Sequence, residues 1–125
     1  MKKILLDTNF FLVPFQLGVN IISEFDRIME EPYQMMTLQP MKDELEKLAS
    51  AGKGDDKNSA RLGAHLARNI EVAEAGGKGD NAIVDYAKSH EDVLVATNDS
   101  ALRKRLREFK IRTIFVRNRS KLEIG

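Results

Sequence analysis

The sequence predicts an α/β protein, a three-layer sandwich with a central, mainly parallel sheet. Short apolar runs typical of buried strands alternate along the chain with segments whose apolar residues have helical spacing. No internal repeat, low-complexity segment or linker interrupts this alternation. Such a pattern is typical of parallel strands joined by crossover helices, which cover both faces of the sheet.

The first half of the chain predicts two strands and two helices. A strand over residues 3–6 is an apolar run that stops at Asp7. Residues 19–31 have near-helical apolar spacing between Gly18 and Pro32, and residues 34–38 predict a second strand. Pro40 suits the first turn of a helix that continues to Ala51.

The second half continues the alternation after a predicted polar loop over residues 52–57. Asn58 would cap a helix over 59–68, and a short strand follows over 70–73. Gly-rich residues 76–79 precede a helix over 80–89, a strand over 92–97, a basic amphipathic helix over 99–109 and a strand over 113–116. We expect one domain over residues 1–125, with a basic C-terminal tail from about residue 117.

Composition excludes several kinds of site. The 125 residues suit one domain with its own core, and 42% of them are hydrophobic. The chain has no cysteine, which excludes disulfides and thiolate metal centres, and its two histidines lie in separate predicted segments. The apolar run near the N-terminus is too short for a signal peptide, and no stretch is long enough for a membrane span. We therefore expect a cytoplasmic protein without a membrane partner.

Charge is distributed unevenly along the chain. Residues 101–125 contain nine Lys or Arg against two Glu, a net charge of +7, whereas the first hundred residues carry −6. The basic segment is either a solvated helix face with a frayed tail or a surface for a polyanion, and the run as a whole favours a polyanion. Arg103, Lys104 and Arg107 lie on or near the polar face of the predicted helix, and we expect them to bind nucleic acid.

Four acidic residues are expected to meet at one edge of the sheet. Asp7 and Asp99 follow two predicted strands, and Glu44 and Asp80 lie near the starts of two predicted helices. Ligands of parallel sheets bind at the carboxyl ends of the strands. Gathered carboxylates repel one another unless a cation is present, and Mg²⁺ or Mn²⁺ prefers such oxygen ligands. A divalent cation at this place would support cleavage of a phosphodiester without a histidine base.

Taken singly, each acid also has a purely structural interpretation. Asp7, Asp80 and Asp99 occupy positions typical of helix caps, and Glu44 is spaced to pair with Lys47 on a helix surface. Their joint placement favours the metal site.

Four segments of the sequence resemble the PIN domain family in order and spacing: residues 5–9, 42–48, 79–83 and 95–102. The resemblance covers nearly the whole chain. It implies a metal-dependent endonuclease of single-stranded RNA, in which Asp7, Glu44, Asp80 and Asp99 are the catalytic acids that bind Mg²⁺ or Mn²⁺. It also implies that Thr8, Asn9, Thr97 and Asn98 are polar supporting residues.

Within this family, residues 97–103 and 115–122 look more like the archaeal and eukaryotic branch that processes ribosomal RNA. VapC-type toxin ribonucleases are the alternative branch. A third hypothesis is a non-catalytic scaffold that binds RNA or a ribosome-assembly partner, and a homodimer also stays open.

Several other residues of the sequence bear on the choice of function. Asp55 and Asp56 are either solvated loop charges or a substrate-proximal addition, and Asp85 is turned away from Asp80. Phenylalanines 10, 11 and 15 are either core residues or a base-stacking platform. Asn9 stands where a dehalogenase-like phosphatase needs Asp, the acid and lysine pattern of a receiver domain is not met, and residues 76–79 lack the spacing of a Walker loop.

Overall fold

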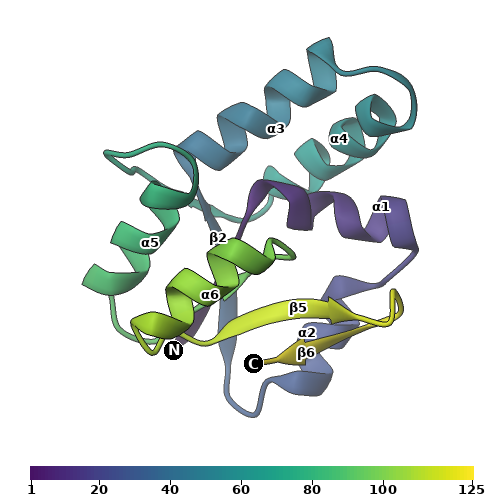
Figure 1. Cartoon of the computed structure of the whole chain (residues 1–125). Helices are drawn as coiled ribbons and strands as arrows, with labels where there is room; N and C mark the ends of the chain where they lie inside the picture. The colour runs from purple at the N-terminus through teal and green to yellow at the C-terminus, as the bar shows by residue number, and fades with distance from the viewer.

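The computed structural model describes all residues 1–125 and contains one six-stranded sheet (Figure 1). The strand order is β3-β2-β1-β4-β5-β6. All neighbouring strands are parallel except β6, which is antiparallel to β5. The strands are β1 Lys2–Leu6, β2 Tyr33–Leu38, β3 Glu71–Ala73, β4 Val93–Ala96, β5 Thr113–Arg117 and β6 Lys121–Ile124.

Helices cover both faces of the sheet, so the predicted three-layer α/β fold with a mainly parallel sheet is confirmed (Figure 1). The helical segments are a 3₁₀ helix η1 Thr8–Leu12, followed by α1 Val13–Leu17, α2 Ile21–Ile28, α3 Gln39–Ala51, α4 Gly54–Ala67, α5 Gly79–Ser89 and α6 Ser100–Glu108.

Side-chain alternation along β1 divides the core into two halves. Ile4 and Leu6 pack with buried residues of η1, α1, α2 and α4, whereas Leu5 packs with buried residues of α5 and α6. Helix α3 contributes to both halves, through Leu45 on the first side and Met41 on the second. Because α3 begins directly after β2 ends, its N-terminal half lies at the carboxyl edge of the sheet.

The structure differs from the sequence prediction between β1 and β2. Residues 8–17 are helical, although their apolar residues show no amphipathic period because most of them are buried. The helix predicted over 19–31 is shorter and covers only Ile21–Ile28. Asn20 caps it, accepting a hydrogen bond from the Ser23 amide at 3.1 Å, and the backbone becomes extended at Met29.

The polar loop predicted over residues 52–57 is mostly helix. Helix α4 begins at Gly54, which leaves only two residues after α3, and Asn58 lies inside the helix instead of capping it. Asp55 and Asp56 occupy the first turn, where the helix dipole favours negative charge. Both are exposed, consistent with the solvated interpretation.

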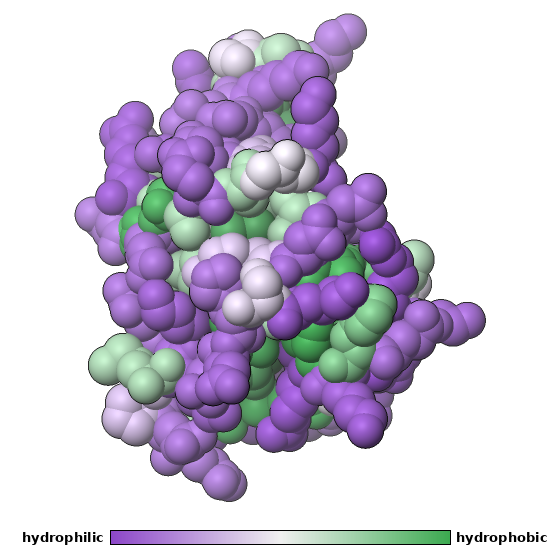
Figure 2. All heavy atoms as spheres, turned by 90° about the vertical axis from the view of Figure 1, so that its left-hand side faces the viewer, coloured by the Kyte–Doolittle hydropathy of each residue, from purple (hydrophilic) through white to green (hydrophobic).

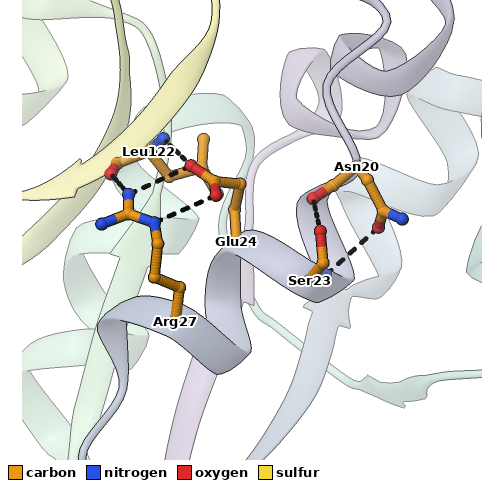
Figure 3. A network of polar contacts seen from close by, with 5 residues as sticks. All are labelled: Asn20, Ser23, Glu24, Arg27 and Leu122. Carbon is orange, nitrogen blue, oxygen red and sulfur yellow. Dashed lines mark hydrogen bonds and ion pairs between the residues drawn. The ribbon is translucent and has the colours of Figure 1, made fainter.

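The C-terminal residues, for which the sequence predicts a basic tail, include strand β6. Helix α2 holds the outer edge of this strand (Figure 3). The Leu122 amide donates to Glu24 at 2.8 Å, and Arg27 donates to the Leu122 carbonyl at 2.7 Å. Arg27 also donates two hydrogen bonds of 3.0 Å to Glu24. This pair satisfies backbone groups that an edge strand would otherwise leave open.

The outer surface is largely hydrophilic on the side that carries α5 and α6, with smaller apolar areas between the polar side chains (Figure 2). None of the helices combines the length and the apolar character needed to cross a lipid bilayer.

Candidate active site

The candidate site begins at Asp7, the residue after β1. Its amide still donates to the Ala96 carbonyl of β4 at 3.0 Å, so the sheet ladder fixes the backbone. The residue is 8% exposed. One oxygen accepts from the Thr8 amide at 2.8 Å, and the other accepts from the Thr97 hydroxyl at 2.7 Å. Asp7 therefore caps η1, as its structural interpretation suggested, and also faces the carboxyl edge of the sheet.

Asp99 lies one strand away, where β4 passes into α6. One carboxylate oxygen caps the helix, accepting from the amides of Ala101 at 2.9 Å and Leu102 at 3.1 Å. The Asp99 amide donates to the Thr97 hydroxyl at 3.1 Å. Thr97 thus donates to one acid and accepts from the backbone of the other, which sets the relative position of Asp7 and Asp99.

Glu44 and Asp80 approach the same edge from two helices. Glu44 of α3 accepts a hydrogen bond of 3.1 Å from the Thr8 hydroxyl and forms no ion pair with Lys47. Asp80 lies in the first turn of α5, directly after Gly79. The φ of Gly79 is +55°, a conformation that glycine adopts without strain.

The four acids line one pocket of about 270 Å³ at the carboxyl edge of the sheet. Thr8, Asn9 and Gly79 contribute polar and backbone surface to it, and three apolar side chains complete the wall: Leu12, Met41 and Leu48. We call this the acid pocket. The four acids, two from strand ends and two from helices, therefore share one cavity.

Burial and like charges both disfavour the ionised acids of the acid pocket. Burial raises the pKa of Asp7 against the opposing hydrogen bonds from Thr97 and Thr8, and the charges of Asp80 and Glu44 raise it further. Burial also raises the pKa of Asp80, with additional repulsion from Asp99 and Glu44. The four carboxylates are thus close enough to disfavour one another's ionised forms.

The donor set of the pocket fits a hard divalent cation. All four acids offer oxygen, and neither histidine lines the pocket. Asp7 and Thr97 are held by a buried hydrogen bond, whereas Glu44 lies near the middle of α3 and Asp80 in the first turn of α5, both less buried than Asp7. As the side chains stand, no three of them already form the ligand set of one ion. Ligation of a cation would therefore involve rotation of the more exposed carboxylates.

The other residues named from the sequence have separate positions. Asn98 does not line the pocket; its side-chain oxygen accepts from the Val116 amide at 2.9 Å and ties the loop to β5. Arg103 stacks on Phe115, with 3.5 Å from the guanidinium carbon to the ring centroid, and Lys104 and Arg107 are exposed on α6. None of these three basic residues lines the acid pocket.

The structure also places the features that had two interpretations. Phe10 and Phe11 are fully buried core residues, and the half-exposed Phe15 lines a different, apolar cavity beside Ile22. None of them contributes a stacking platform to the acid pocket. Asp85 lines another surface hollow, so its omission from the site agrees with its position.

The sequence did not identify Arg105, the basic residue whose charge acts on an acid of the pocket. It donates to the Asn81 side chain at 3.0 Å, and its charge lowers the pKa of Asp80 in opposition to burial and Asp99. Helical spacing from the sequence already places residue 105 on one flank of the buried Leu102 and Leu106, and Arg103 on the other flank. Only the packing of α6 against α5 shows that this flank faces Asp80.

Comparison with known proteins agrees with this geometry. The profile of the PIN like domain family matches residues 4–119. Ribonuclease VapC4 of Methanocaldococcus jannaschii is 35% identical over 127 residues, which cover 99% of this chain and 97% of that protein. Ribonuclease VapC9 of Archaeoglobus fulgidus is 32% identical over 54% of this chain and 50% of its own length.

Among solved structures, that of the PIN domain endonuclease Utp24 is similar, with a TM-score of 0.81 at 25% identity. The match covers 98% of this chain and 90% of that one. Family profile, full-length relative and fold agree, and this chain belongs to the PIN-like domain family.

Proposed function

We propose that this chain is a metal-dependent endoribonuclease that hydrolyses phosphodiester bonds of single-stranded RNA. One observation carries the proposal: acids from four separate segments, Asp7, Glu44, Asp80 and Asp99, line one pocket at the carboxyl edge of the sheet. Such a concentration of negative charge has no use in packing and disfavours its own ionisation. A divalent cation removes that conflict.

In this mechanism the four acids would hold Mg²⁺ or Mn²⁺ by their oxygens. A bound divalent cation lowers the pKa of a water molecule and offsets negative charge on the leaving oxygen of a phosphodiester. The chain supplies orientation. Thr97 and the Thr8 amide fix both oxygens of Asp7, and the Thr8 hydroxyl holds Glu44 toward it. Asn98 fixes the loop before Asp99 against β5.

The basic residues of α6 complete the proposed site. Arg103, Lys104 and Arg107 follow Asp99 along the helix, and we assign them to the phosphate backbone of the RNA. RNA as substrate is supported by two relatives, ribonucleases VapC4 and VapC9, and endonucleolytic cleavage is supported by the endonuclease Utp24 among the solved structures.

The cellular role has two candidates. The resemblance of residues 97–103 and 115–122 favours processing of ribosomal RNA, which we propose as the role. The full-length similarity to ribonuclease VapC4 favours a toxin instead. Induced expression in a bacterial host distinguishes them: arrest of growth by the wild-type chain, absent with Asp7→Asn, would indicate a toxin, whereas normal growth supports processing.

Cleavage of a labelled single-stranded RNA by the purified chain, with and without Mn²⁺, tests the activity. We expect cleavage only with the metal, and none from Asp7→Asn or Asp99→Asn. Full activity of both variants would contradict the assigned mechanism. RNA binding without any metal-stimulated cleavage would support the scaffold hypothesis, including one that serves ribosome assembly.

A further inference from the structure

One face of the β5–β6 hairpin lies on the side of the sheet that carries α6. Along β5, Ile114 and Val116 point into the core beside α2 and α4. Phe115 and Arg117 alternate with them and therefore face the side of the sheet that carries α6. Both are opposite polar residues of β6, in the pairs Phe115–Glu123 and Arg117–Lys121.

Arg103 of α6 lies over this face without a charged partner. Its guanidinium carbon is 3.5 Å from the centroid of the Phe115 ring, no ion pair includes it, and its Nε is buried without a hydrogen-bond acceptor. Burial lowers the pKa of Arg103, and the charges of Arg107 and Arg117 lower it further. The charge of Glu123 acts in the opposite direction, and this residue forms an ion pair of 3.4 Å with Arg117. Arg103 and Arg107 of α6 take part in no ion pair.

The turn of the hairpin adds a fourth arginine in a strained position. The Ser120 amide donates to the Arg117 carbonyl at 3.2 Å, and the two residues between them have positive φ, +53° for Asn118 and +57° for Arg119. These are the features of a type I′ turn, whose second central position favours glycine. An arginine at this position places a positive charge at the tip of the hairpin but strains the backbone.

We propose that Arg103, Arg107, Arg117 and Arg119 form a phosphate-binding surface, which we call the arginine surface, for the RNA strand that passes out of the acid pocket. The proposal rests on the proposed function. Arg103 lies one helical turn after Asp99, about 6 Å along α6. The hydrogen bond from Val116 to Asn98 joins β5 to the same acid-bearing loop. The arginine surface therefore begins where the acid pocket ends.

Guanidinium chemistry favours a phosphate backbone as the occupant. A planar guanidinium donates in pairs to phosphate oxygens, and an aromatic ring beneath it holds it in place without neutralising its charge. Lys104 belongs to the phosphate contacts proposed for α6 but not to the arginine surface, because it lies on the opposite side of α6 from the buried Leu102 and Leu106. We thus assign the strand path to the β5 flank of α6.

Fluorescence anisotropy with a labelled single-stranded oligonucleotide tests this assignment. The full chain carries Asp7→Asn, so that the RNA stays intact in Mg²⁺ buffer. Kd is measured at several salt concentrations between about 0.05 and 0.2 M. We expect Arg103→Ala and Arg117→Ala each to raise Kd by roughly fivefold. Each should also reduce the slope of log K against log salt by about 0.7, the value for one phosphate contact on a single strand. Arg61→Ala, an exposed arginine of α4, serves as the matched control.

Arg119→Gly separates binding from folding. Glycine relieves the strained turn, so the melting temperature should rise while RNA affinity and the salt slope both fall. Arg103→Lys keeps the charge but loses the planar stack on Phe115. It should keep the slope of log K against log salt but raise Kd.

Three outcomes would overturn the proposal. If the arginine variants bind RNA as Arg61→Ala does, while the wild-type chain still cleaves RNA with Mn²⁺, the surface is wrong and the proposed function stands. If poly-glutamate binds and RNA does not, the surface serves an acidic protein. If the wild-type chain neither binds nor cleaves RNA, the proposed function fails and takes this inference with it.

Discussion

Asp7 and Glu24 are both carboxylates held by a backbone amide and a side-chain donor, yet their pKa values shift in opposite directions. Glu24 accepts from Arg27 and from the Leu122 amide, and these contacts, the arginine first, lower its pKa (Figure 3). Asp7 accepts from Thr97 and Thr8, but burial and two neighbouring acids raise its pKa.

The difference separates an acid that serves the fold from acids that serve a ligand. The network of Glu24, Arg27 and Leu122 satisfies its charges within the chain and closes the edge of β6. The acid pocket gathers four carboxylates, and the one cation that acts on Asp80, Arg105, does not balance them. Natural proteins keep such unfavourable groups where function requires them.

The largest expected effect comes from removing one acid of the pocket. Asp80→Asn should lower metal-dependent RNA cleavage by at least about 10²-fold, because several kcal/mol of charge stabilisation would be lost. Asp85→Asn is the matched control, since it changes the same residue type on the same helix outside the acid pocket. Equal rates for the two variants, measured on one labelled RNA, would show that Asp80 has no part in the reaction.

A smaller effect is expected from the residue that joins two acids. Thr97→Val preserves the shape of the side chain but removes the donor to Asp7 and the acceptor for the Asp99 amide. Support of this kind for a metal ligand is typically worth 10- to 100-fold in affinity or activity, and we expect roughly such a loss of cleavage. Thr113→Val, a buried threonine of β5 outside the pocket, is the control for the general cost of the change. Similar losses in both would contradict the positioning role of Thr97.

We also expect that Asp7→Asn, which should abolish RNA cleavage, makes the metal-free fold more stable. The raised pKa of Asp7 means that the folded chain binds this proton more tightly than the unfolded chain does. Ionised Asp7 therefore destabilises the metal-free fold at neutral pH, and the penalty disappears as pH falls through its raised pKa. Asp7→Asn should increase the free energy of unfolding at pH 7, with a gain that shrinks in acid. Urea unfolding in a chelator measures it, and a less stable variant at pH 7 would contradict the account.

The smallest effect is the reverse one at the other site. The pKa of Glu24 is lowered in the folded chain, so its contribution to stability is present at neutral pH and is lost as pH falls through that lowered value. Glu24→Gln should reduce the melting temperature slightly at pH 7, and the difference should vanish in acid. RNA cleavage should be unchanged. A melting difference that grows in acid would show that another group governs this edge of the sheet.

The parts of the fold that local pattern specifies were predictable. Strands β1, β2 and β4 are apolar runs with clear ends, and α3 and α5 begin with Pro or Gly signals and have regular apolar spacing. Because parallel strands end at a common edge, the order of strands and helices was enough to place Asp7 and Asp99 together.

The missed parts depend on contacts between distant residues. Strand β6 has a basic, tail-like composition, and it is held by a tight turn at Asn118 and by Glu24 and Arg27, about a hundred residues earlier. Helix η1 lacks amphipathic spacing because its apolar residues are all buried, and α1 has only five residues, too few to show a helical period. Arg105 was missed for a similar reason, since its approach to Asp80 follows from the packing of two helices.

Calorimetric titration of Mn²⁺ into the purified chain at pH 7 tests the central claim most directly, because it needs no substrate. The account predicts saturable binding to the wild-type chain, binding at least about tenfold weaker for Glu44→Gln, and wild-type binding for Glu46→Gln, an exposed glutamate of the same helix outside the acid pocket. No binding to the wild-type chain, or equal binding to both variants, would contradict the claim that the acid pocket is built for a cation.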